Sequence, residues 1–481
     1  MHRPFRLLTP WVAAAPVILL LAGCGNPGTP TGDNAQTNQT PPAKDTPEQA
    51  PASPSTKAPA REVTPNRVVD ARQLVDVVKA EVKGGEATGG PSPANVYWMK
   101  SDPAKIRDEP LTVEPPLGLN PLTPNAVVPA YNPLTKGKVE LGKLLYFDPR
   151  VSKDGTVSCA TCHNPEKGWT DQLPHSIGIK GQEGQRNAPT VLNTAYGRTM
   201  FWDGRAPSLE GQAQGPIQNK IEMGDQTYQE IVARLQQVPE YQERFQTVFG
   251  TPVTLDGMAK AIASFERTAL SGNSAFDRYN SQNDVAALTD SQKRGMVLFG
   301  LTLNSEDTFQ TDVVRKKANC TSCHIGFNFT DEKFHNLGVG WDDTTGKFAD
   351  LGLWAIAPIG AKNDAEIGAF KTPTLRDLER TAPYMHDGSE KTLEEIVEYY
   401  DRGGNANPAL DPDMKKLNLT AQEKADLVAF LKSLTGEPLK VALPTLPPGP
   451  DGQRPDPAAA LKPPAAPKAA ALGTLHLGVV R

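Results

Sequence analysis

The sequence contains few cysteines, only five in 481 residues, and it has no excess of basic residues, since its formal net charge is −5. Cys24 stands near the N-terminus, and the other four cysteines form two Cys-x-x-Cys pairs. No cysteine is left over for a structural disulfide. The charge gives no reason to expect a nucleic-acid partner. These absences exclude a disulfide-rich scaffold and argue against a nucleic-acid-binding protein.

The longest apolar run covers only residues 11–21 and is too short to span a bilayer. Arg3 and Arg6 precede it, and Leu21-Ala22-Gly23-Cys24 follows, so residues 1–23 are predicted to be a signal peptide. This end resembles a bacterial lipobox, which implies a mature chain that starts at a diacylated Cys24. The residue after it is Gly25, not Asp, which favours the outer membrane. The alternative is a plain secretory leader with an incidental cysteine. Either leader predicts export to the periplasm.

Both ends of the mature chain are predicted to lack structure. Residues 24–66 are rich in Pro and Thr, poor in large apolar residues, and typical of a disordered tether. Residues 441–481 are a Pro/Ala-rich tail to which no structure is assigned. Residues 67–123 form an N-terminal extension, in which residues 68–82 show helical periodicity.

The part between these ends is predicted to be mainly α-helical with long loops. Thr254, Thr289 and Thr420 stand where N-caps are expected, and Pro and Gly are too frequent for long strands. The expected helices, with apolar residues at i, i+3 and i+4, cover residues 228–238, 255–270, 291–301, 393–400 and 421–434. We expect two helical domains, residues 124–280 and 281–440, that meet near residues 273–284.

The strongest signal is a pair of pentads, Cys159-Ala160-Thr161-Cys162-His163 and Cys320-Thr321-Ser322-Cys323-His324. Two cysteines at this spacing can bond to the two vinyl groups of one porphyrin, and the adjoining His then ligates the iron. A redox dithiol or half of a zinc site is the alternative for a single Cys-x-x-Cys pair. Two pentads with His at the same place, in an exported chain, favour two covalently bound haem c groups. The two helical domains are therefore expected to be class-I cytochrome c-like haem domains, one for each pentad.

Several further motifs resemble the bacterial dihaem cytochrome c peroxidases, most of all the branch that includes MauG. The resemblance covers about residues 141–434, with the motifs in order. The motifs are the segment 147–152 (FDPRVS), the first pentad, 186–190 (RNAPT), 201–205 (FWDGR), Gln212 through 222–224 (EMG), and 382–388 (APYMHDG).

The resemblance implies that the first haem, on His163, is the peroxidatic one. Glu222 falls where the family keeps its distal acid/base, and Gln212 and Pro216 match other positions of that pocket. Several family members place a removable His ligand where this chain has Ile179, which cannot ligate iron. His175 lies four residues earlier in the sequence and is an alternative candidate for this ligand. We therefore expect a first haem that is five-coordinate or water-bound in the ferric enzyme and needs no reductive priming.

The second haem, on His324, is expected to be six-coordinate and to transfer electrons. The resemblance puts its distal ligand at Tyr400, and helix geometry places Tyr400 on the face of residues 393, 396 and 397. A core tyrosine, with the ligand supplied by Met385 or Met414, is the alternative. A phenolate ligand would lower the haem potential relative to a thioether.

Two further features are implied by resemblance alone. Trp202 matches an aromatic residue between the two haems, where it would carry electrons. Asn187, with the backbone carbonyls of Thr381 and Pro383, matches the Ca²⁺ site of the family, and oxygen ligands of this kind suit Ca²⁺. The role of His335 is not predicted.

The leading hypothesis is a cytochrome c peroxidase, which reduces hydrogen peroxide to water with electrons from a small cytochrome c or cupredoxin. The second hypothesis is a MauG-like enzyme that uses peroxide-derived oxidising equivalents to oxidise residues of a protein partner. Ala318 argues against that substrate, because MauG carries a surface Trp at this place. A haem shuttle without catalysis would leave Glu222 unexplained. A homodimer is compatible with the sequence, which does not give the oligomeric state.

Overall fold

The computed structural model describes residues 108–124 and 127–465, all of which belong to one compact unit, Asn66–Arg481. The leader, Cys24, the tether and the predicted helix at residues 68–82 lie outside the described residues. Within the described ranges, every helix is too short or too polar to cross a membrane.

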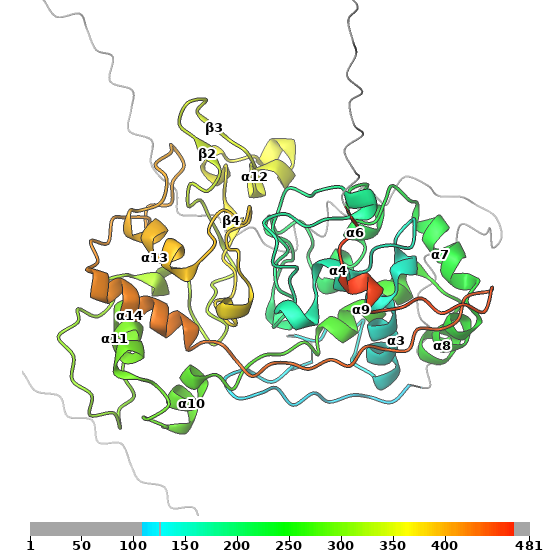
Figure 1. Ribbon diagram of the computed structural model, residues 1–481, viewed down its shortest axis with the longest axis horizontal. Helices are drawn as coiled ribbons and strands as arrows, with labels where there is room; N and C mark the ends of the chain where they lie inside the picture. The colour runs from blue at the N-terminus through cyan, green and yellow to red at the C-terminus, as the bar shows by residue number, and fades with distance from the viewer. Residues whose placement is uncertain (1–107, 125–126, 466–481) are drawn as a thin grey trace, which may run out of the picture. The chain divides into compact units, whose positions relative to one another are not determined.

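The described chain is mainly helical, as predicted, with long loops between the helices (Figure 1). Its longer helices are α3 (Lys136–Phe147), α7 (Tyr228–Gln236), α8 (Pro239–Phe249), α9 (Leu255–Glu266), α10 (Ala275–Gln282), α11 (Asp290–Phe299), α13 (Leu393–Asp401) and α14 (Ala421–Lys432). Short helices of four residues are α4 (Cys159–Cys162), α5 (Leu209–Gln212), α6 (Gly215–Gln218) and α12 (Leu353–Ile356).

The five helices predicted from apolar periodicity are present as α7, α9, α11, α13 and α14. The predicted caps are also confirmed: the side chains of Thr254, Thr289 and Thr420 each accept a hydrogen bond from a backbone N–H of the first turn. Helix α13 ends close to its predicted end. The other four end earlier than the periodicity suggested, because the apolar pattern continues into the following loops.

Two larger apolar cores divide the buried side chains of the described chain. Helices α3, α4, α7, α8 and α9 surround one core, and α10, α11, α13 and α14 surround the other. The same close helix crossing occurs in both. A Cβ on Gly142 of α3 would lie 1.9 Å from the carbonyl oxygen of Ala261 in α9, and one on Gly295 of α11 would lie 1.9 Å from that of Asp426 in α14. Each crossing therefore requires glycine.

Four strands of two residues each form two antiparallel pairs. Strand β1 (Phe334–His335) pairs with β4 (Phe370–Lys371), with Phe334 opposite Lys371. Strand β2 (Trp341–Asp342) pairs with β3 (Lys347–Phe348), with Trp341 opposite Phe348. The β1–β4 pair matters for the site, because His335 and Lys371 line the same cavity as the second pentad.

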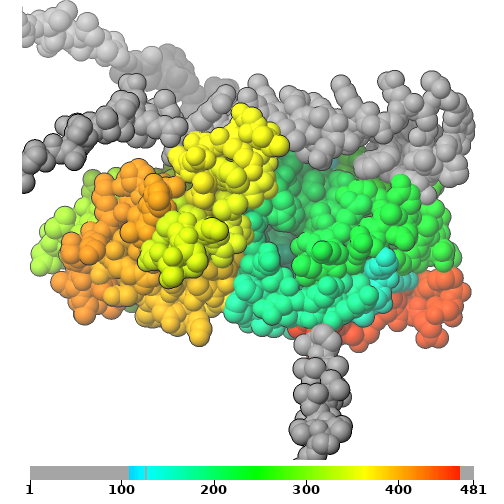
Figure 2. Space-filling view, turned by 90° about the horizontal axis from the view of Figure 1, so that it is seen from above, coloured from blue at the N-terminus to red at the C-terminus, as the bar shows by residue number. Residues whose placement is uncertain are grey.

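The C-terminal segment differs from its prediction. We expected no structure after residue 440, but residues 441–465 lie along the half of the molecule that carries the first pentad, shown in red in Figure 2. Leu446 is buried in the first core, and the carbonyl of buried Ala460 accepts a hydrogen bond of 2.6 Å from Thr161 of α4. Proline and alanine disfavour regular elements, but they do not prevent an extended segment from packing on a core.

Candidate active site

Both pentads are built so that the imidazole can bind iron. The first pentad forms α4 and its C-cap, and the second forms a short 3-10 turn, Cys320–Ser322, with Cys323 and His324 after it. Nδ1 of His163 lies 3.0 Å from the carbonyl oxygen of Pro189, and Nδ1 of His324 lies 2.8 Å from that of Phe329. Such a bond fixes the ring and leaves Nε2 free as a ligand.

The protonation state of the two histidines also suits iron binding. Burial lowers the pKa of His163 from its ordinary value and lowers the pKa of His324 to about 4. Both imidazoles are therefore neutral at pH 7, which is the ligating form. All four pentad cysteines are unpaired thiols, as thioether formation requires. The residues present fit two covalently attached haems.

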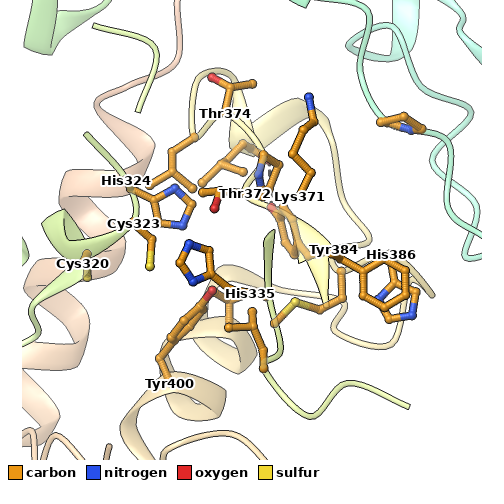
Figure 3. Close-up of a pocket in the computed structure, with 18 of the residues that line it drawn as sticks. Cys320, Cys323, His324, His335, Lys371, Thr372, Thr374, Tyr384, His386 and Tyr400 are labelled. Carbon is orange, nitrogen blue, oxygen red and sulfur yellow. Dashed lines mark hydrogen bonds between the residues drawn. The ribbon is translucent and has the colours of Figure 1, made fainter. Parts of the chain in front are cut away.

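The second pentad opens into a large cavity between α13 and the loops around β1 and β4 (Figure 3). One side of the cavity is lined by residues of the second pentad, Cys320, Cys323 and His324, and Tyr400 of α13 also lines it. Leu393, Ile396 and Val397, on the same helix face, also line the cavity. The neighbouring ring of Tyr399 is turned away, and its hydroxyl donates to the carbonyl of Leu337 at 2.9 Å. Burial raises the pKa of Tyr400, so a charged partner such as iron is needed to ionise it.

Met385 and Met414, the alternative ligands, line the same cavity. His335 lies there too, close to Tyr400 in Figure 3. Its Nδ1 is 2.6 Å from Asp411 and its Nε2 is 3.1 Å from Asp331. Burial opposes the charge, but the hydrogen bonds to both carboxylates raise the pKa of His335 to about 12. Both ring nitrogens of His335 thus lie within hydrogen-bond distance of carboxylates, so neither nitrogen is left free for iron.

Glu222 is held in a turn close to the first pentad. The side chain of Asn219 donates to one Glu222 carboxylate oxygen at 2.6 Å, and the Glu222 carbonyl accepts from the backbone N–H of Ile179 at 2.9 Å. Burial raises the pKa of Glu222 above its ordinary value, while Arg205 and the Asn219 hydrogen bond act against this rise. The charge of Glu222 acts on the thiols of Cys159 and Cys162, so the carboxylate lies near the place of the first haem.

The other residues predicted for the first pocket lie on neighbouring elements. Gln212 ends α5 and Pro216 lies in α6. Ile179 is buried. Its side chain packs against Gly224, where an added Cβ would come within 2.8 Å of the Ile179 Cδ1 atom. His175 is partly exposed, and its Nδ1 lies 3.0 Å from the carboxylate of Glu183.

Trp202 connects the segment of Asn187 with strand β4 through hydrogen bonds. Its indole N–H donates to the carbonyl of Asn187 at 2.9 Å, and its own carbonyl accepts from the N–H of Lys371 at 2.8 Å. The backbone N–H of Asn187 donates in turn to the carbonyl of His386. Trp202, Asn187, Thr381 and Pro383 all line the cavity of the second pentad. The four residues that the resemblance placed between the haems therefore line one cavity, and two of them, Trp202 and Asn187, are in direct contact.

Comparison with known proteins identifies the family. A family model described as di-haem cytochrome c peroxidase matches residues 136–285. The methylamine utilization protein MauG of Methylorubrum extorquens is 42% identical over 323 residues, which cover 66% of this chain and 84% of that protein. This chain belongs to the dihaem cytochrome c peroxidase and MauG family.

Other relatives of this dihaem peroxidase include both cytochrome c peroxidases and MauG-like proteins. The cytochrome c551 peroxidase of Nitrosomonas europaea is 39% identical over 324 residues, covering 67% of this chain and 86% of that protein. The crystal structure of a MauG-like protein associated with microbial copper homeostasis matches with a TM-score of 0.57 and 33% identity, over 69% of this chain and 95% of that one. The family consists of peroxide-dependent oxidoreductases with two haem c groups, so the chain is assigned to that class.

Sequence reasoning about this dihaem peroxidase missed several residues of both pockets. Asp331 and Asp411 hold His335, although 76 residues separate Asp411 from it. Arg205 acts electrostatically on Glu222. The FWDGR motif contained Arg205, but nothing in its spacing indicated a partner.

Proposed function

We propose that this dihaem peroxidase reduces hydrogen peroxide to water with electrons from a small periplasmic cytochrome c or cupredoxin, which enter at the second haem. The observation that supports the proposal is the unequal surroundings of the two pentads. A partly buried carboxylate with a raised pKa, Glu222, lies near the first pentad. A tyrosine on α13, Tyr400, lines the cavity of the second.

At the first site, His163 is the proximal ligand and Glu222 the acid/base. The haem, when bound, supplies an iron that takes peroxide and exchanges electrons. Glu222 would accept a proton from one oxygen of hydrogen peroxide and return it to the other oxygen, which leaves as water. Asn219 orients the Glu222 carboxylate through its 2.6 Å hydrogen bond. Gln212 and Pro216 bound the same pocket, and Ile179 supplies no ligand that would block it.

At the second site, His324 and Tyr400 would hold the haem iron, and Trp202 would carry electrons between the sites. The hydroxyl of Tyr400 makes no hydrogen bond to any residue in the described ranges, so it is available to iron. A phenolate ligand stabilises the oxidised haem. Asn187, with the carbonyls of Thr381 and Pro383, is proposed to hold Ca²⁺ beside Trp202, because oxygen donors at this junction suit that ion. The lipid anchor at Cys24 would fix the enzyme to the periplasmic face of the membrane.

A MauG-like oxidation of a protein partner is the second candidate. Tyr400, the aliphatic Ile179 and the 42% identity to a MauG protein favour it. Ala318 argues against it, because this residue is 6% exposed and its N–H is bonded to the carbonyl of Leu298. Position 318 therefore offers no surface aromatic through which an oxidising equivalent could leave the second site.

One experiment separates the two functions. The purified dihaem protein is mixed with hydrogen peroxide and a reduced small cytochrome c, and the oxidation of the cytochrome is followed by stopped flow. We expect repeated turnover in the fully ferric starting enzyme, without prior reduction. A long-lived oxidised state that leaves the cytochrome reduced would instead support the MauG-like function. No reaction with peroxide would contradict both.

A further inference from the structure

Trp169 is buried close to the first pentad in an unfavourable arrangement. It lies six residues after His163 and is 1% exposed. Its φ of 63° falls in the left-handed region, which bulky residues rarely adopt. Its indole N–H has no hydrogen-bond partner within residues 108–124 and 127–465. Both features cost free energy, and in native proteins such costs are concentrated at functional residues.

The indole of Trp169 is connected to the proximal histidine through a single aromatic ring. Its ring centroid lies 5.7 Å from that of Tyr146 in α3. The hydroxyl of Tyr146 donates to the backbone carbonyl of His163 at 2.7 Å. Phe265 of α9 packs on the rings of Trp169 and Tyr146, at centroid distances of 5.9 and 5.1 Å. Cys159, which fits a haem attachment, packs against the same core. A single electron can therefore pass between the indole and the first site through groups in direct contact.

The other tryptophans of the described ranges have different surroundings. The indole N–H groups of Trp202 and Trp341 donate to protein oxygen atoms, at 2.9 and 2.7 Å. Trp354 also has an indole N–H without a partner, but Nζ of Lys362 lies 3.5 Å from the centre of its ring. A cation at this distance opposes the removal of an electron from the ring. Within the described part of the chain, Trp169 combines burial, an unpaired N–H and the absence of a cation over its ring.

Of the two connected rings, that of Trp169 is better suited to give up an electron. Oxidation of a phenol at neutral pH releases its proton, and the carbonyl oxygen that accepts the Tyr146 hydrogen bond is too weak a base to take this proton. An indole can lose one electron and keep its N–H proton, which leaves a positive charge on the ring. The neighbouring rings of Tyr146 and Phe265 stabilise such a charge by cation–π attraction.

We propose that Trp169 is a redox site of this chain, which holds one oxidising equivalent when peroxide has reacted and no reduced donor is present. Reduction of hydrogen peroxide to water takes two electrons from the first site. One electron then passes from the indole of Trp169 to that site, so the site is reduced by one electron and the indole is oxidised by one. The N–H proton stays on the indole, and an electron from a reduced cytochrome later restores it. This inference rests on the proposed reaction with peroxide.

Electron paramagnetic resonance of the freeze-quenched holoenzyme tests the proposal. The ferric protein is mixed with hydrogen peroxide in the absence of a donor, and we expect a narrow organic radical signal in addition to those of the haems. Tryptophan deuterated on the indole ring should narrow this signal, whereas ring-deuterated tyrosine should leave it unchanged. Reduced cytochrome c, added after the peroxide, should abolish it. Trp169→Phe keeps an aromatic ring in the core and should lose the signal.

Trp354→Phe is the matched control, because Trp354 also has an unpaired indole N–H but lies under Lys362, and this variant should keep the wild-type signal. Every variant is checked for two haems by its ferric spectrum. A signal of wild-type intensity in Trp169→Phe overturns the proposal. If Trp169→Phe does not assemble, a wild-type signal that deuterated tryptophan leaves unchanged overturns it. Consumption of peroxide without any organic radical refutes the role of Trp169 alone, whereas no reaction with peroxide refutes the proposed function as well.

Discussion

Glu222→Gln is expected to slow the peroxide-dependent oxidation of a reduced cytochrome by about 10²–10⁴-fold. The amide has nearly the same size and can still accept the hydrogen bond from Asn219, but it cannot take the proton from peroxide. The ferric spectra of both haems should therefore stay as in the wild type. Stopped-flow turnover, measured on samples with matched haem content, checks this result.

The pH dependence follows from the same carboxylate. The base works only when deprotonated, and burial raises the pKa of Glu222 above its ordinary value. The wild-type rate should thus rise as pH rises through this elevated pKa, and Glu222→Gln should lose that limb. Glu243→Gln, on the exposed face of α8, removes the same charge from a helix that carries neither pentad and serves as control. A Glu222→Gln enzyme as fast as Glu243→Gln would remove Glu222 from the mechanism.

Arg376→Met is expected to lower the free energy of unfolding by about 3–5 kcal/mol. Arg376 and Asp277 form a buried ion pair, with side chains 1% and 2% exposed, and bonds of 2.8 and 2.9 Å. Arg376 also donates to the carbonyls of Phe327 and Gly118. Methionine leaves the Asp277 charge and two carbonyls without these partners in the interior. Denaturant unfolding, followed by circular dichroism, measures the loss.

Two comparisons test whether the loss of stability comes from the buried ion pair: a double variant and a variant of a surface pair. Arg376→Met with Asp277→Leu removes both charges, so it should recover part of the lost stability. Lys136 and Glu109 form an ion pair with side chains 61% and 73% exposed, and Lys136→Met should cost less than about 1 kcal/mol. Equal losses in Arg376→Met and Lys136→Met would show that the buried pair contributes no more than a surface contact.

The helices that could be predicted are those with strong apolar periodicity and a capping Thr, such as α9 and α14. Helix α10 was missed, because it is largely polar and its stability depends on the capping box of Ser274 and Asp277 and on the buried Arg376. The packed C-terminal segment was missed for a related reason. The carbonyl of Ala460 is bonded to Thr161, 299 positions away in the chain, and no local pattern indicates such a contact.

The residues of the two sites also differ in how far the sequence could predict them. The pentads are local, so spacing alone identified them, and helix periodicity placed Tyr400 on the face that lines the cavity. Glu222, Trp202 and Asn187 came from resemblance, since no local pattern distinguishes them from loop residues. The Asp331–His335–Asp411 cluster and the Arg205–Phe201 contact needed the structure, because both depend on how the loops fold.

The two haems are proposed to be unequal, and the ferric spectrum tests this inequality most directly. Electron paramagnetic resonance of the fully oxidised protein should show one high-spin haem and one low-spin haem. Tyr400→Phe should change the low-spin signals and leave the high-spin signal as it is. Two low-spin haems in the wild type, or an unchanged spectrum in Tyr400→Phe, would contradict the account.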